Sequence, residues 1–183
     1  MSKIFNELDH RLSTVRRWGV LVTVQDQSLA EHLVNVERIA TRIAQYWFHI
    51  EDTEKLYRIS QLALHHDNLE VLSGDLPAMV KPYFAEKEFA EDHKDLVPWS
   101  YDPNPDIRMI VKLADKLEGY HFLAVERQMG NSYAFNHWKA ERPIIMELIA
   151  ELWPGNMGLM NLAVSFMNDC DGERSERHSR RGR

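Results

Sequence analysis

Hydrophobic residues recur every three or four positions through most of this chain, which is the period of an amphipathic helix. The pattern predicts helices near residues 2–15, 28–49, 53–68, 75–92, 104–130, 137–152 and 157–169. Alternating β-branched runs are scarce. The run Val20–Val24 has the composition of a strand but is isolated, so we interpret it as an extended connector. We therefore expect an all-α fold.

Polar residues mark where several of these helices begin. Ser28, followed three residues later by Glu31, predicts a capping box at the start of the second helix. Asp52 or Thr53 can cap the third helix. Asp75 lies in a Ser-Gly-Asp-Leu-Pro turn, where its role can be that of a helix cap alone.

Length and composition indicate one compact domain. The chain has 183 residues, of which 44% are hydrophobic, and we expect the domain over residues 1–170 and a polar tail over 171–183. The net charge of −6 argues against broad contact with duplex nucleic acid. Cys170 is the single cysteine, and we find neither a secretory leader nor an apolar run long enough to span a bilayer. We therefore expect a soluble protein of the cytoplasm.

Four potential metal ligands lie in strongly apolar, helix-like stretches: His32, the adjacent pair His66 and Asp67, and Asp115. A lone histidine is more often a hydrogen-bonded core or surface residue, but three helices can bring these four side chains to one ion. Imidazole and carboxylate suit divalent ions such as zinc, cobalt or manganese. Two of each would leave coordination positions open for water and substrate, so the pattern favours a catalytic metal.

Glu70 follows this pair closely. It lies three residues after Asp67 and four after His66, on neighbouring parts of one helical face. This place suits a base beside the metal, although the residue can equally be a surface glutamate.

The order His32, His66-Asp67, Asp115 resembles that of the HD-domain metal-dependent phosphohydrolases, from about Arg17 to about Glu126. The resemblance implies an HD-domain helical bundle with the metal site between helices, and hydrolysis of a phosphoester. In similar bacterial 5′-deoxynucleotidases, comparable motifs supply a catalytic glutamate and an aspartate near the attacking water. On this chain they correspond to Glu70 and Asp75.

The same resemblance implies a substrate-binding pair, Arg17 and Trp18. Arg17 would hold phosphate through its guanidinium fork, and Trp18 would form a wall against the nucleoside, although a tryptophan here is in isolation more often a core residue. Lys81 and Lys116 are further cations close to site elements in sequence, where each alone is typical of a solvated lysine.

Two groups of this family are most similar, namely bacterial 5′-deoxynucleotidases and phage dATP triphosphohydrolases. In the phage enzymes an aliphatic residue and a proline wall the adenine, and Val20 and Pro77 take those places here. We therefore favour hydrolysis of dATP to deoxyadenosine and triphosphate, in the host cytoplasm if the protein is phage-encoded. The alternatives are hydrolysis of deoxynucleoside monophosphates and a non-enzymatic nucleotide-binding scaffold. Relatives also imply a homo-oligomer, either a dimer or a hexamer.

Overall fold

The computed structural model describes residues 10–19, 21–75, 86–93 and 101–172. Within this part of the chain the regular elements are all helices, so the expected all-α fold is confirmed. The elements are α2 (Leu29–Arg42), the π-helix η1 (Ile43–Trp47), α3 (Thr53–His65), α4 (Glu70–Ser73), α5 (Glu86–Asp92), α6 (Pro105–Gln128), α7 (Ser132–Leu152) and α8 (Met157–Cys170).

Capping side chains begin the helices of the site as the sequence predicts. Ser28 and Glu31 form the expected capping box at the start of α2. The Asp52 carboxylate accepts hydrogen bonds from the amides of Glu54 and Lys55, so Asp52 rather than Thr53 caps α3. At the start of α6, the side chain of Asn104 accepts from two backbone amides and Pro105 takes the first position of the helix.

Several predicted ranges differ from the structure. In the range 2–15, residues 10 and 11 are helical, whereas residues 12–15 form turns and a bend. The range 28–49 is divided between α2 and η1 and ends at Trp47. α3 ends at His65, three residues before the predicted end. Residue 75 is not helical, because Gly74 adopts a φ of 77° and ends the short α4, and the described helix nearest the predicted range 75–92 is α5. α7 begins at Ser132 rather than 137, because the side chain of Asn131 caps it there.

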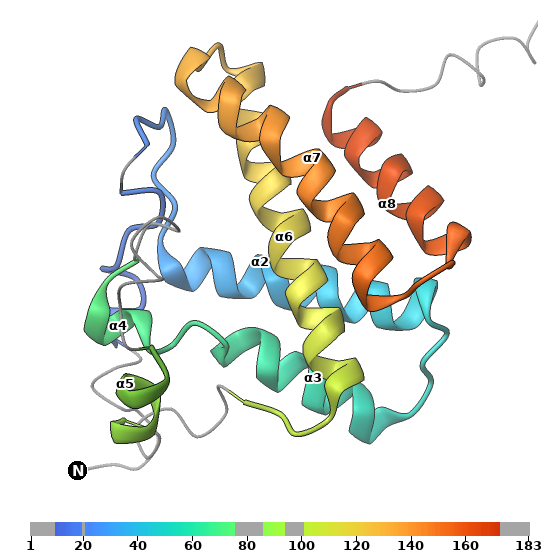
Figure 1. Ribbon diagram of the computed structural model, residues 1–183. Helices are drawn as coiled ribbons and strands as arrows, with labels where there is room; N and C mark the ends of the chain where they lie inside the picture. The colour runs from blue at the N-terminus through green and yellow to red at the C-terminus, as the bar shows by residue number, and fades with distance from the viewer. Residues whose placement is uncertain (1–9, 20, 76–85, 94–100, 173–183) are drawn as a thin grey trace, which may run out of the picture.

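Helix α6 lies at the centre of the molecule (Figure 1) and packs against α2, α3, α7 and α8. Its buried face includes Leu113, Leu117, Tyr120 and Leu123, none of which is exposed to solvent. Burial of such apolar side chains contributes roughly 1.5–3 kcal/mol each. Helix α6 is therefore the rigid element against which the other site residues are positioned.

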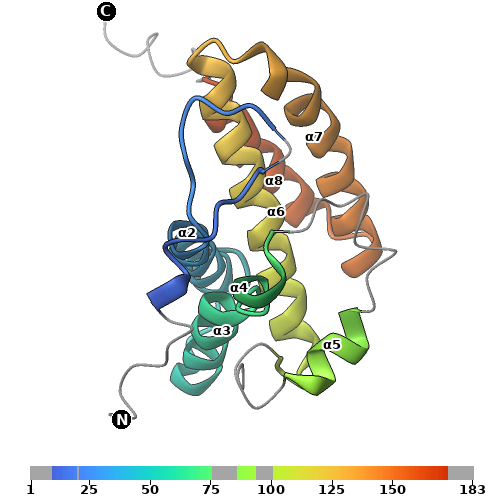
Figure 2. The ribbon, with the colours of Figure 1, turned by 90° about the vertical axis from the view of Figure 1, so that its left-hand side faces the viewer.

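A smaller apolar cluster holds the segment before α2. Leu29, Leu33 and Val71 are buried together, with Leu12 and Val15 packed against them. This packing joins the N-terminal segment and α4 to α2. Figure 2 shows the segment before α2 running along α6 before the chain enters α2.

The described helices include none that is both long enough and apolar enough to cross a membrane.

Candidate metal centre

His32 projects from the first turns of α2 and is completely buried. Its Nδ1 lies 2.8 Å from Oε2 of Glu118, and because a carboxylate oxygen accepts, Nδ1 carries the hydrogen. In the neutral imidazole, Nε2 therefore presents a lone pair, 3.3 Å from Asp115 and 3.6 Å from Asp67. This is the geometry of an imidazole prepared to bind a cation.

His66 is the C-cap of α3 and keeps helical dihedral angles, and Asp67 follows it directly. The Nδ1 of His66 donates to the carbonyl of Ala63 at 2.9 Å, which leaves its Nε2 as an acceptor. That Nε2 lies 3.4 Å from Asp67 and 3.9 Å from Asp115. These two adjacent residues thus face one point.

His32, His66, Asp67 and Asp115 come together as one cluster, in which one ligand atom from each lies within 4.8 Å of the others. Both Nε2 atoms are buried and make no hydrogen bond. Buried polar atoms without hydrogen bonds are costly, and a shared cation would satisfy both nitrogens and both carboxylates. The cluster therefore fits the expected divalent metal ion.

Charge at the cluster also favours a cation. Burial opposes protonation of His32, but the nearby carboxylates of Asp115, Asp67 and Glu118 outweigh it and raise the pKa of His32 to about 10. Burial likewise opposes ionisation of Asp67 and Asp115, yet the neighbouring histidines hold the pKa of each below its usual range. A metal ion binding here would replace protons that the carboxylates otherwise attract.

Arg17 lies directly beside this cluster. Its Nη1 donates to Oδ2 of Asp67 at 2.8 Å and lies 3.9 Å from Oε2 of Glu70. Burial disfavours the charged guanidinium, but Asp67 and the other nearby carboxylates outweigh it and raise the pKa of Arg17. Its Nε is buried and makes no hydrogen bond, so the structure leaves one donor available to an anionic ligand beside the metal position.

Trp18 adopts a φ of 62°, in the left-handed region that few bulky residues occupy. Its backbone amide donates to Oδ2 of Asp75 at 2.8 Å, which holds this turn in place. The indole stacks on the ring of Phe122, with ring centroids 5.2 Å apart and an angle of 6° between the ring planes. Its edge also lies close to Gly119, where an added Cβ would be 3.7 Å from the indole. Trp18 is therefore fixed against α6 close to the metal cluster.

The other predicted site residues have different surroundings. Glu70 is buried at the start of α4, near Arg17, rather than on the surface. Lys116 is half-buried on α6 and makes no ion pair with another described residue. Val20, Pro77 and Lys81 lie outside the described residues.

Three residues that the sequence analysis did not single out support the site. Glu118 bonds the ring of His32, and Gln27 bonds both Glu118 and Trp18. Glu126 accepts hydrogen bonds from the backbone of residues 24 and 25. Of these three residues, Glu118 could have been found from its spacing, because it follows Asp115 by three positions and so lies on the same face of the helix.

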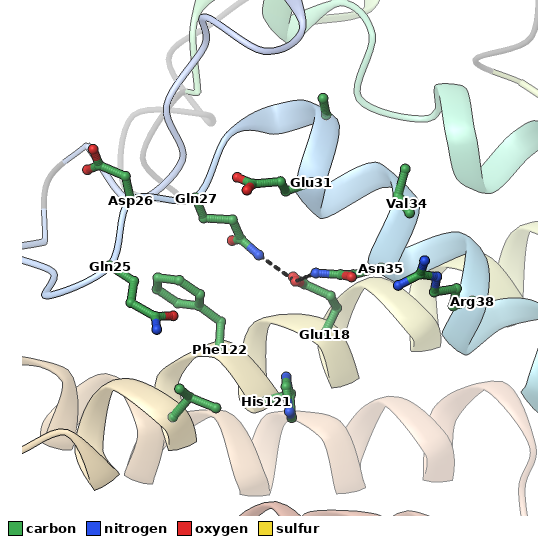
Figure 3. Close-up of a pocket in the computed structure, with 12 residues that line it drawn as sticks. Gln25, Asp26, Gln27, Glu31, Val34, Asn35, Arg38, Glu118, His121 and Phe122 are labelled. Carbon is green, nitrogen blue, oxygen red and sulfur yellow. Dashed lines mark hydrogen bonds between the residues drawn. The ribbon is translucent and has the colours of Figure 1, made fainter.

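A pocket of about 570 Å³ lies beside the cluster, between residues 25–27, α2 and α6. Figure 3 shows that Gln27, Asn35 and Glu118 meet on its wall. The four cluster residues do not line it. The pocket and the metal centre therefore lie next to Glu118 without being the same cavity.

Comparison with known proteins decides the family. Residues 4–87 match the family model described as 5′-deoxynucleotidase YfbR-like. A 5′-deoxynucleotidase of Vibrio parahaemolyticus is 31% identical over 142 residues, covering 66% of this chain and 73% of the relative. One from Photorhabdus temperata is 30% identical over 162 residues, covering 76% and 81%. The chain belongs to the YfbR-like family.

The YfbR-like similarity extends into the C-terminal helices. A 5′-deoxynucleotidase of Shewanella oneidensis is 29% identical over 195 residues, covering 93% of this chain and 92% of the relative. The HD phosphohydrolase DatZ of cyanophage S-2L, solved with dA and one catalytic Zn²⁺ ion, has the same fold. Its TM-score is 0.76 at 18% identity, over 94% of this chain and 99% of DatZ.

These findings confirm that this YfbR-like protein is an HD-domain phosphohydrolase. The prediction of an enzyme rather than a scaffold is confirmed, and the His/Asp cluster is consistent with the predicted divalent metal ion. The expected dimer or hexamer stays a prediction.

Proposed function

We propose that the protein is a 5′-deoxynucleotidase, which converts deoxynucleoside 5′-monophosphates to deoxynucleosides and phosphate. The sequence analysis favoured dATP as the substrate, but the named relatives support its alternative, the monophosphates. The observation that carries the proposal is the position of Arg17, whose guanidinium borders a metal cluster of the right donor types.

The metal ion would be held by His32, His66, Asp67 and Asp115. When bound, a divalent ion of this kind polarises a phosphoryl oxygen and lowers the pKa of a coordinated water. Zinc is supported by the Zn²⁺ ion of the phage structure, while cobalt and manganese suit the same donors.

Arg17 would bind the substrate phosphate. Its Nη1 is already engaged by Asp67, whereas its buried Nε has no hydrogen-bond acceptor. A phosphate oxygen at this position would receive a charge-assisted hydrogen bond. Trp18 follows directly in sequence, and we assign its indole to the sugar or base.

Glu70 and Asp75 have separate roles in this proposal. Glu70 is buried beside Arg17 and would accept a proton from the attacking water. Water adds to phosphorus, and the bond from phosphorus to the 5′ oxygen breaks. That oxygen takes the proton that Glu70 accepted from the water and leaves as the hydroxyl of the deoxynucleoside. Asp75 would hold the Arg17-Trp18 turn through the Trp18 amide while lying near the water.

The test is product analysis of the purified protein with zinc, cobalt or manganese and each deoxynucleoside mono- and triphosphate. We expect phosphate and deoxynucleoside from several monophosphates, with little action on dATP. Intact triphosphate and deoxyadenosine from dATP, without monophosphate turnover, would overturn the proposal in favour of the phage-type activity. The His66→Ala variant, prepared identically, controls for contaminating phosphatases, and it should retain its helical content while losing activity.

A further inference from the structure

One face of α6 carries a row of residues directed at the site. Asp115, Glu118, Gly119, Phe122 and Glu126 are spaced by three, one, three and four positions, so they lie along one side of the helix. Asp115 belongs to the metal cluster, whereas Gly119 and Phe122 contact the ring of Trp18. Glu118 lies between these two sets.

Glu118 is a buried carboxylate with three donors. Only 1% of the residue is exposed. Its Oε2 accepts from Nδ1 of His32 at 2.8 Å, and its Oε1 accepts from the side-chain amides of Gln27 at 2.5 Å and Asn35 at 3.4 Å (Figure 3 shows the two amide contacts). A carboxylate held this way sets both the tautomer and the orientation of the imidazole.

Gln27 continues the connection toward the substrate side. The indole Nε1 of Trp18 can only donate, and it donates to Oε1 of Gln27 at 2.9 Å. The amide nitrogen of Gln27 must then face Glu118, and it does. Gln27 is 6% exposed, so both halves of its amide depend on these two partners.

The four side chains form an unbroken path. It runs from the indole of Trp18 through Gln27 and Glu118 to His32, whose Nε2 faces Asp67 and Asp115. Every donor in the path meets an acceptor, and reversing the Gln27 amide would break two contacts at once.

We propose that Glu118 and Gln27 are positioning residues that hold the metal-binding imidazole of His32 and the indole of Trp18 as one hydrogen-bonded unit. Metal affinity and nucleotide affinity then depend on the same buried pair. The nucleotide half of this inference rests on the proposed function, whereas the metal half requires only that His32 binds an ion.

Each hydrogen bond in the path has a fixed donor and acceptor, and this order allows a rescue experiment. The Glu118→Gln variant keeps the shape of the side chain but has only one acceptor oxygen. If that oxygen accepts from His32, the new amide nitrogen opposes the amide nitrogen of Gln27, which must rotate and leave Trp18 without an acceptor. If the oxygen accepts from Gln27, His32 loses its acceptor. Gln27→Glu alone opposes two carboxylates. The double variant Gln27→Glu/Glu118→Gln exchanges the two groups and restores the three contacts of the path. Trp18 then donates to the carboxylate at position 27, the amide nitrogen at position 118 donates to the same carboxylate, and His32 donates to the amide oxygen at position 118. Only the long contact from Asn35 at 3.4 Å is lost.

Metal affinity is measured without substrate, by competition between a chromogenic chelator and the metal-free protein for Zn²⁺ or Co²⁺. We expect Glu118→Gln to weaken binding about 10- to 100-fold, as loss of such a supporting carboxylate usually does. The exchanged double variant should recover to within about threefold of wild type. Unchanged affinity in Glu118→Gln, or a folded double variant without recovery, would overturn the metal half.

Nucleotide affinity is measured at saturating metal on Gln27→Ala, which leaves the contact between Glu118 and His32 in place. We expect KM for a deoxynucleoside monophosphate to rise about 5- to 10-fold, as for one lost hydrogen bond, with kcat within about twofold. If Gln27→Ala and wild type have equal KM values, the proposed link between Gln27 and nucleotide affinity is wrong. Glu147→Gln, at an exposed position of α7, is the matched control and should behave as wild type.

The two assays also separate this inference from the proposed function. If wild type hydrolyses no monophosphate, the proposed function fails, and chelator competition still decides whether Glu118 supports His32. If turnover is normal but the variants bind metal and nucleotide as wild type does, the inference fails and the proposed function stands.

Discussion

The buried carboxylate of Glu126 provides a test of how the segment before α2 is held, because it is completely buried between that segment and the start of α7. Its Oε2 accepts from the amide of Val24 at 2.7 Å and from Nδ2 of Asn131 at 2.6 Å, and its Oε1 accepts from the amide of Gln25 at 2.8 Å. The Asn131 side chain also donates to the carbonyl of Val22. The Glu126→Gln substitution changes this anchor without changing its shape.

The expected cost follows from the count of acceptors. Glutamine at 126 keeps one acceptor oxygen. That oxygen satisfies most donors in the place of Oε2, where it accepts from Val24 and Asn131, so the amide nitrogen faces the amide of Gln25 and one donor loses its partner. A buried donor without a partner costs about 1–3 kcal/mol. Gln25 lies in an exposed part of the segment, where water can replace some of the loss, so we expect about 1–2 kcal/mol. For a protein of this length, that lowers Tm by about 2–8 °C.

Thermal unfolding followed by circular dichroism measures this change. The control Glu147→Gln makes the same chemical substitution at an exposed site of α7 and should change the free energy of unfolding by less than about 0.5 kcal/mol. Hydrogen exchange should also accelerate at the amides of Val24 and Gln25 in Glu126→Gln. If Glu126→Gln unfolds at the temperature of wild type, the segment is not held by this carboxylate and the reasoning is refuted.

Three further predictions concern the site and the core. Arg17→Lys removes the guanidinium fork, and we expect kcat/KM for a monophosphate to fall about 10- to 100-fold in steady-state assays; an unchanged value would contradict phosphate binding by Arg17. Gly119→Ala places its Cβ at ordinary contact distance from Trp18, so Tm should rise by about 2–4 °C through helix propensity, whereas Gly119→Leu should displace the indole and raise KM. Burial opposes ionisation of Asp102, but hydrogen bonds from Arg58 lower its pKa in the folded protein. The ion pair therefore stabilises the fold at pH values above the pKa of Asp102 in the unfolded chain, and this stabilisation is lost as the pH falls through the pKa of Asp102 in the folded protein. Arg58→Gln should therefore lower Tm at pH 7, and its difference from wild type should shrink below about pH 4; a constant difference would contradict this.

Local sequence patterns predicted the framework of the site. The capping box at Ser28 sets the start of α2 and hence the place of His32 on its first turns. Helical periodicity likewise placed Asp115 inside the long α6. These features depend on neighbours within four positions, which a single sequence displays directly.

The contacts that complete the site are long-range, and spacing does not reveal them. His32 and Glu118 are 86 positions apart, and the amide of Val24 meets Glu126 across 102 positions. The periodicity also predicts that α3 continues through 68, although the helix ends at His65. Tertiary packing decides such ends and pairings, and local propensity does not encode it.

The account depends most directly on one divalent ion bound by the four-residue cluster. The decisive measurement is phosphate release from a deoxynucleoside monophosphate as Co²⁺ or Zn²⁺ is titrated into chelator-treated protein. We predict no activity without metal, a linear rise to one equivalent and a plateau beyond it, with Asp67→Ala folded but inactive throughout. Full activity in the metal-free protein, or in Asp67→Ala, would contradict the account.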